Sequence, residues 1–168
     1  MPRNTEIKAR IDDLSSLAAA VALLADRGPE LIEQDDTFFH CENGRLKLRV
    51  FANGKGELIF YQRPNQTGPK ESFYVISPTD NPDSLRRALR LAYGEVGRVR
   101  KRRTLYLIGR TRVHLDEVEG LGSFLELEVV FEESESAAEG ETIARDLLAK
   151  LGISTENLIE GAYLDLLR

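Results

Sequence analysis

Several segments of this chain alternate strictly between charged and apolar side chains. The clearest of them, residues 45–50, reads Arg-Leu-Lys-Leu-Arg-Val, so that every second side chain is a cation. Side chains two residues apart on a β-strand lie on the same face of the sheet. The segment is therefore expected to be a strand with one cationic and one apolar face.

The same alternation recurs along the chain, with different charges in different segments. The polar faces are made by Asn4, Glu6, Lys8 and Arg10, by Lys101 and Arg103, by Arg110, Arg112, His114 and Asp116, and by Glu126 and Glu128. Taken strand by strand, such a face is most simply the solvent side of a half-buried antiparallel sheet. Cations and acids are segregated here, however, whereas a merely soluble surface intersperses both signs. The segregation favours a sheet that curls into a closed barrel with its charged faces inside.

Turn signals and apolar periodicity divide the whole chain into strands and helices. Gly28-Pro29 is expected to end the first helix, Asn43-Gly44 to form a hairpin turn, and Pro78 with Pro82 to close a strand, while residues 64–70 are expected to form an exposed loop. Strands are predicted at 5–11, 31–40, 45–51, 57–63, 72–77, 97–108, 111–118 and 122–132, and helices at 14–25, 82–94, 142–151 and 157–167. With no repeat and no internal boundary, residues 1–168 are predicted to form a single domain.

Composition narrows the classes of function. The 168 residues include 23 Lys and Arg against 28 Asp and Glu, a formal net charge of −5, which argues against a nucleic-acid or membrane-surface partner. Any bound anion must then be met by locally placed cations. The single Cys41 cannot form an internal disulfide, and no segment approaches the ~20 apolar residues of a membrane span. A cytoplasmic protein is expected.

A barrel lined in this way would place cations opposite carboxylates. The oxygens of a triphosphate are bound by several Lys and Arg side chains, and paired carboxylates hold Mg²⁺ or Mn²⁺, because these cations prefer oxygen ligands. Either set of charges alone would repel itself inside a barrel, and a bound ligand and metal would relieve that repulsion. The pattern therefore favours a site for a triphosphate and a divalent metal.

Five segments, in order along the chain, resemble the CYTH superfamily, also called the triphosphate tunnel metalloenzymes. They are residues 4–10, 44–49, 58–64, 109–122 and 124–128. The most specific is Leu-Asp-Glu-Val-Glu-Gly-Leu-Gly at 115–122, followed by Glu-Leu-Glu at 126–128. The resemblance implies an α+β fold in which an eight-stranded antiparallel β-barrel, the triphosphate tunnel, is surrounded by helices. Class IV adenylate cyclases, thiamine triphosphatases and inorganic triphosphatases belong to this superfamily.

By position in these motifs, the resemblance implies roles for single residues. The substrate-binding set is Lys8, Arg45, Lys47, Arg49, Arg63, Lys101, Arg103 and Arg112; the metal ligands, for Mg²⁺ or Mn²⁺, are Glu6, Asp116, Glu126 and Glu128; and the catalytic candidates are Lys8, Arg112 and His114. Three of these roles stay open. Arg45 begins its strand and could lie at the tunnel mouth, Gln62 could take the place of Arg63, and His114 could be a general base, a metal ligand or a hydrogen-bond partner.

One position departs from the superfamily pattern. Asn4 stands where the N-terminal Glu-x-Glu-x-Lys motif has its first Glu, so one carboxylate is lost and the number of metals is left open. An Asn carbonyl oxygen can still bind a metal.

Three functions are consistent with these residues. The leading hypothesis is a metal-dependent triphosphate phosphohydrolase that acts on a small molecule. The alternatives are a class IV adenylate cyclase, in which the ribose 3′-hydroxyl of ATP replaces water as the nucleophile, and a non-catalytic module that binds polyphosphate or nucleotides, which the loss of a carboxylate at Asn4 suggests. No segment identifies a site for adenine, and the protein could be a monomer or a homodimer.

Overall fold

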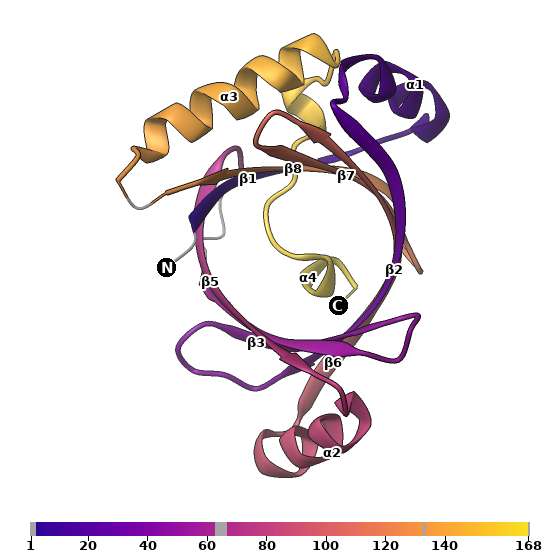
Figure 1. The fold of residues 1–168 in the computed structure, drawn as a ribbon, viewed down its shortest axis with the longest axis vertical. Coiled ribbons are helices and arrows are strands. Elements are labelled where there is room, and N and C mark those ends of the chain that lie inside the picture. The colour runs from indigo at the N-terminus through magenta and orange to yellow at the C-terminus, as the bar shows by residue number, and fades with distance from the viewer. Residues whose placement is uncertain (1–2, 63–66, 133, 168) are drawn as a thin grey trace.

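The computed structural model describes residues 3–62, 67–132 and 134–167. In these residues eight antiparallel strands close into a barrel, in the order β1-β5-β4-β3-β2-β6-β7-β8 (Figure 1). The strands are β1 (Arg3–Arg10), β2 (Arg27–Phe39), β3 (Arg45–Phe51), β4 (Gly56–Gln62), β5 (Lys70–Thr79), β6 (Glu95–Ile108), β7 (Thr111–Val118) and β8 (Gly122–Phe131). The predicted barrel is confirmed.

Two strands extend past the proline residues that were expected to bound them. β2 begins at Arg27, so Gly28 and Pro29 belong to the strand, and the β2–β6 pairing shifts register between Arg27 and Glu30. Such an irregularity accommodates a residue without an N–H. β5 continues through Pro78 to Thr79, which was also not predicted. Because the β1–β5 register ends at Phe73, β5 is paired on one side only at Pro78, where a missing N–H is tolerated.

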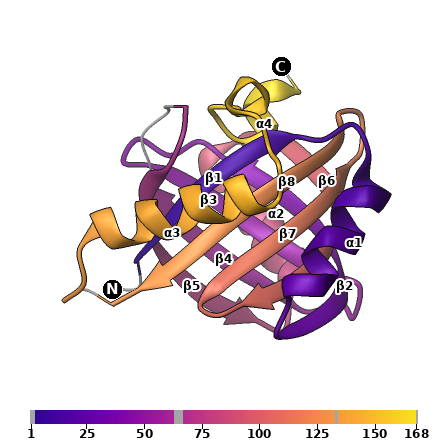
Figure 2. The same ribbon diagram turned by 90° about the horizontal axis from the view of Figure 1, so that it is seen from above.

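The longer helices cover the outside of the barrel. α1 (Leu14–Leu24) packs against β6 and β7, and α3 (Ala137–Lys150) packs across β1 and β8 (Figure 2). α2 (Pro82–Tyr93) packs against β2 and β3 on another side of the barrel (Figure 1). α3 begins before the predicted residue 142, because its first turn packs closely on β1, where a Cβ at Gly140 would lie 2.6 Å from the Thr5 hydroxyl. None of the helices in the described part of the chain is long and apolar enough to cross a membrane.

The C-terminal segment is less helical than predicted. Within the expected 157–167 region, only α4 (Tyr163–Leu166) and Asn157, the last residue of the 3₁₀ turn Thr155–Asn157, are helical. The reason is a contact with β1, because the backbone N–H of Ile159 donates to the carbonyl of Lys8 at 2.9 Å and Leu158 forms a bridge with Ala9. This contact leads the chain to one end of the barrel, where α4 lies (Figures 1 and 2).

The apolar core has two parts. One part fills the space between the barrel wall and the helices α1 and α3, and includes Val21, Val113, Leu127 and Ala144. The other part closes the end of the barrel where α4 lies, and consists of Phe38, Ile59, Tyr61, Val99, Val118, Phe124, Tyr163 and Leu164. The apolar strand faces therefore pack outward under helices or close one end, which leaves the charged faces for the interior.

Candidate active site in the barrel tunnel

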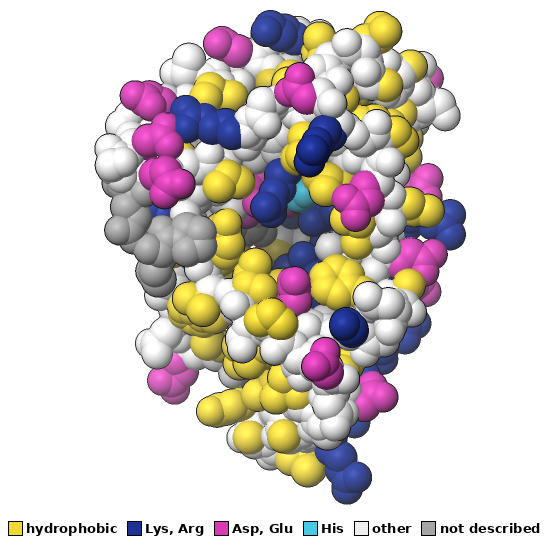
Figure 3. Space-filling model, viewed as in Figure 1, with side chains coloured by type: hydrophobic (Ala, Val, Ile, Leu, Met, Phe, Trp, Pro, Cys, Tyr) yellow, Lys and Arg dark blue, Asp and Glu magenta, His cyan; other side chains and the backbone are white. Residues whose placement is uncertain are grey.

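The barrel encloses a cavity of about 530 Å³. Figure 3 looks into it from the end opposite α4 and shows Lys, Arg and His side chains within the hollow. The predicted site residues that line it are Glu6, Lys8, Lys47, Arg49, Lys101, Arg103, Arg112, His114, Glu126 and Glu128. Ala162 and Tyr163 line it from the α4 end. The alternation in the sequence thus brings predicted residues from five strands, β1, β3, β6, β7 and β8, to one cavity.

A cationic group, defined as Lys47, Arg49 and Lys101, surrounds one carboxylate in this cavity. Asp36 is 1% exposed and accepts two hydrogen bonds of 2.8 Å, which Nε and Nη2 of Arg49 donate. Its Oδ2 also lies 3.2 Å from Lys47 Nζ and 3.7 Å from Lys101 Nζ. Burial opposes ionisation of Asp36, but these cations outweigh it and hold the pKa of the carboxyl well below its usual range.

The same burial acts on the lysines of the cationic group. Burial and the neighbouring Arg49 lower the pKa of Lys47 to about 8, although Asp36 opposes the change. Burial and Arg103 lower the pKa of Lys101 well below its ordinary value. The group is therefore short of negative charge, as a binding site for an anion would be.

An acidic group, defined as Glu6, Glu126 and Glu128, faces the same cavity from β1 and β8. Glu6 and Glu128 are direct cross-strand partners. Burial and the charges of Glu6 and Glu126 raise the pKa of Glu128 to about 7. The carboxylates of the acidic group therefore repel one another, and the effect is strongest at Glu128.

His114 lies beside the acidic group. Its Nδ1 is 3.4 Å from Oε1 of Glu126, and the two residues are cross-strand partners on β7 and β8. Burial and the charge of Arg103 lower the pKa of His114 to about 4, so the imidazole is neutral at pH 7. Burial opposes ionisation of Glu126, but the bond from His114 and the charge of Lys8, 3.6 Å away, hold its pKa well below its usual value.

These residues fit a divalent cation. Ligand atoms of His114, Glu126 and Glu128 all lie within 4.8 Å of one another. Asn4, two residues from Glu6 on the same face, lines the cavity, and its buried Oδ1 has no hydrogen-bond partner among the described residues. The two carboxylates and the amide oxygen are of the ligand type that Mg²⁺ and Mn²⁺ prefer, and the imidazole of His114 adds a nitrogen ligand of the type that transition metals accept.

Asp116 is held away from the acidic group by other partners. It is fully buried and accepts hydrogen bonds of 2.7 and 2.8 Å from Nε and Nη2 of Arg103. The hydroxyl of Tyr163 donates to its Oδ2 at 2.7 Å. Burial opposes its ionisation, but Arg103 outweighs it and lowers the pKa to about 2. Both oxygens are engaged, so in this structure Asp116 fixes Arg103, whose Nη2 then lies 3.7 Å from Glu126.

Arg45 and Arg112 lie at opposite ends of the tunnel. Arg45 pairs with Asp165 of α4 at 2.6 Å and does not line the cavity, so the structure places it at the closed end. Arg112, whose side chain is 50% exposed, is 3.5 Å from Glu128 at the open end. Lys8 donates to the carbonyl of Gly161 at 3.3 Å. Arg63 lies outside the described residues.

Asp36 and Tyr163 also belong to the site, although the sequence pattern did not predict them. Gln34, Asp36 and Phe38 share one strand face, and this alternation could have indicated that Asp36 points inward. The uninterrupted run of polar residues in which it stands, Glu33 to Asp36, conceals the pattern. For Tyr163 the sequence carries no such signal, because its position depends on where the C-terminal segment crosses the barrel.

A closed antiparallel barrel whose interior combines a cationic group with a group of carboxylates defines a triphosphate tunnel fold. The model of the CYTH domain matches residues 2–163, and the chain belongs to this family.

Known relatives cover nearly the whole chain. Adenylate cyclase CyaB of Aeromonas hydrophila is 27% identical over 94% of this chain and 85% of its own length. The structure of PH1012 from Pyrococcus horikoshii OT3 matches with a TM-score of 0.86 at 24% identity, over 97% of this chain and 98% of that one. HpAC1 of Hippeastrum, named for adenylyl cyclase and found to have a dominant triphosphatase activity, matches with a TM-score of 0.68 at 16% identity, over 96% and 91% of the two chains.

Proposed function

We propose that this protein is a divalent-metal-dependent enzyme that hydrolyses small molecules carrying a triphosphate. The observation that carries the proposal is that the cationic group and the acidic group face one enclosed cavity of about 530 Å³. The cations are opposite in charge to a polyphosphate, and the carboxylates are opposite in charge to a metal ion. Membership in a family of adenylate cyclases and triphosphatases supports an enzyme with this chemistry.

The phosphate chain would be bound by the buried cations. Lys47, Lys101 and Arg49 each have N–H donors beyond those that contact Asp36, since an ammonium has three donors and a guanidinium five. Arg103, which Asp116 holds in one orientation, lies between this group and Glu126. Charge-assisted hydrogen bonds from these side chains would orient the phosphates and stabilise the charge that develops during transfer.

The metal would be held at the acidic end. Glu126, Glu128 and His114 are the proposed ligands, with Glu6 and Asn4 beside them. A bound Mg²⁺ or Mn²⁺ would supply Lewis-acid stabilisation of phosphate oxygens and lower the pKa of a bound water. Asp116, which the motif resemblance also assigns to the metal, would instead keep Arg103 in position. Lys8, between Glu126 and the ring of Tyr163, would add a cation where the two groups meet.

Cyclisation of ATP is the second candidate, and the 27% identity to adenylate cyclase CyaB favours it. The two reactions differ in the nucleophile, which is water in hydrolysis and the ribose 3′-hydroxyl in cyclisation. Hydrolysis requires only that the phosphates and metal be held, and the described cavity supplies groups for both. The triphosphatase activity of the structural relative HpAC1 is consistent with this choice.

Product analysis tests the proposal. Purified protein with Mg²⁺ or Mn²⁺ should release phosphate or pyrophosphate from tripolyphosphate, thiamine triphosphate or ATP. From ATP, ADP with phosphate supports hydrolysis, whereas cyclic AMP with pyrophosphate supports the cyclase. Binding of tripolyphosphate that persists in chelator, with no turnover in either metal, would identify a non-catalytic module instead.

Two arginine variants provide a matched comparison. Arg49→Gln removes a largely buried cation of the tunnel and should lower turnover at least tenfold. Arg102→Gln removes the same charge from the outer face of β6, where the side chain is 58% exposed and pairs with Glu33, and should leave turnover unchanged. Equal loss in both variants would contradict a site inside the tunnel.

A further inference from the structure

Asp36 stands where a carboxylate is least expected in a site for phosphate. It is an anion buried among the cations that would bind another anion. On charge alone, its presence should weaken the binding of polyphosphate, because like charges at close range repel in a site of low dielectric. Its geometry indicates a different effect.

The position of Asp36 in the sheet explains how one carboxylate reaches three cations. β2 lies between β3 and β6, and Asp36 is the direct cross-strand partner of Arg49. Lys47, opposite Phe38, and Lys101, opposite Gln34, are its diagonal neighbours on the two flanking strands. Diagonal neighbours on one face are within reach of long side chains.

The contacts constrain Arg49 most strongly. Two parallel N–H···O bonds of 2.8 Å fix the plane of its guanidinium. The two lysine ammonium groups, at 3.2 and 3.7 Å, converge on the same Oδ2 that accepts from Arg49 Nη2. Without this shared carboxylate, three mutually repelling cations of long, flexible side chains would have no common point of attachment.

We propose that Asp36 is a positioning residue that holds Arg49, Lys47 and Lys101 convergent on one phosphate group of the substrate. The inference rests on the proposed function, since it assumes that a polyphosphate occupies the tunnel. Each of these cations keeps N–H donors that Asp36 does not use, and these donors would bind the phosphate. Asp36 itself would not contact the phosphate. The binding energy of the phosphate is then not spent on ordering its own ligands.

The proposal and the simple charge argument predict opposite changes in the affinity for tripolyphosphate when Asp36 is replaced by Asn. If Asp36 only opposes the ligand, removal of its charge should tighten tripolyphosphate binding. If Asp36 positions the cations, the variant should bind tripolyphosphate at least tenfold more weakly. Asp36→Glu keeps the charge but changes the reach of the carboxylate, so this variant should also bind tripolyphosphate more weakly. If only the charge mattered, its affinity would equal that of the unaltered protein.

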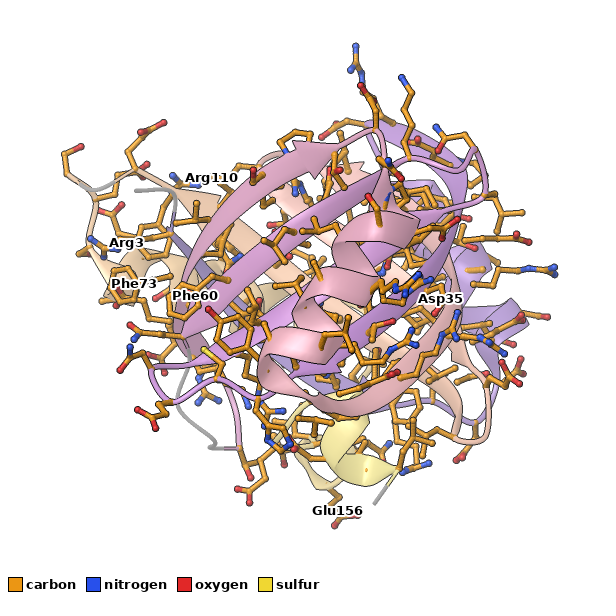
Figure 4. The ribbon with its side chains drawn as sticks, turned by 90° about the horizontal axis from the view of Figure 1, so that it is seen from below. Arg3, Asp35, Phe60, Phe73, Arg110 and Glu156 are labelled. Carbon is orange, nitrogen blue, oxygen red and sulfur yellow. The ribbon has the colours of Figure 1, made fainter. Side chains whose placement is uncertain are left out.

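Asp35→Asn is the matched control. Asp35 precedes Asp36 on β2 but lies on the outer surface of the barrel (Figure 4), where it accepts bonds of 2.7 and 2.6 Å from Arg98. This variant removes the same charge and a similar bidentate pair outside the tunnel. Its affinity for tripolyphosphate should equal that of the unaltered protein.

Calorimetric titration of tripolyphosphate into the full chain in EDTA measures these affinities, with kcat and KM measured in Mg²⁺ alongside. The positioning role also predicts that Asp36→Asn weakens binding far less when Arg49 is already replaced by Gln, because the two changes remove one interaction. If both Asp36 variants bind tripolyphosphate as tightly as the unaltered protein, or more tightly, the positioning role is wrong and the proposed function still stands. An unaltered protein that neither binds nor turns over tripolyphosphate would instead overturn the proposed function.

Discussion

Replacement of Glu128 by Gln should stabilise the metal-free protein at alkaline pH. Burial and the charges of Glu6 and Glu126 raise the pKa of Glu128 from the ordinary 4.5 to about 7. Between these two values the unfolded chain gives up its proton while the folded chain retains it. The stability that the protonated group contributes is therefore complete below pH 4.5 and is lost as the pH rises through 7.

The magnitude follows from the size of that pKa change. At 1.36 kcal/mol per pH unit, a rise from 4.5 to about 7 costs the folded state about 3 kcal/mol above pH 7. Glu128→Gln removes this cost, and the ion pair it gives up is with the half-exposed Arg112, which contributes little. For a chain of this size, about 3 kcal/mol corresponds to a rise in Tm of roughly 6–12 °C.

Thermal unfolding in EDTA at pH 5 and pH 8 measures this effect. The variant should exceed the unaltered protein in Tm at pH 8 by several degrees and differ much less at pH 5. In a separate measurement without EDTA, added Mn²⁺ should raise the Tm of the unaltered protein. It should have little effect on the variant, because a proposed metal ligand is lost. Glu117→Gln, on the exposed outer face of β7, is the control and should change neither. A variant no more stable than the unaltered protein at pH 8 would refute the assignment of Glu128 to a crowded acidic group.

Three further predictions concern other residues of the tunnel. Asp116→Asn should lower the free energy of unfolding, measured in urea, by about 3 kcal/mol or more, because Arg103 would be left buried without its counter-ion. Tyr163→Phe removes one hydrogen bond to Asp116 and should lower it by only about 1 kcal/mol. Similar losses in the two variants would contradict this ranking. Tripolyphosphate should bind more weakly at pH 9 than at pH 7 in calorimetry, because Lys47, with a pKa of about 8, loses its charge between them, and equal affinities would show that this charge is not used. His114→Gln should weaken Mn²⁺ binding about tenfold or more in calorimetric titration, and an unchanged Kd would remove His114 from the ligand set.

The strand faces and the barrel could be predicted because they depend on local alternation. In residues 45–51, 111–118 and 122–131, every second side chain belongs to one face whatever partner the strand acquires. Segregation of the charges among these faces was enough to indicate which side is interior. Lys47, Arg49, Lys101, Glu126 and Glu128 all line the cavity for this reason.

The partner of each charge was decided by the tertiary structure. Alternation defines the face of a strand but not its register, and a slip of two residues keeps every side chain on its face while changing all its neighbours. Asp36 reaches Lys101 only because β2 pairs with β6, and Asp116 is held by Arg103 only because β6 and β7 place them opposite each other. The raised pKa of Glu128 has the same origin, since it depends on distances between carboxylates of β1 and β8 that are brought together when the barrel closes. Electrostatic interactions depend on distance and burial, and both are set by packing between segments that are far apart in the sequence.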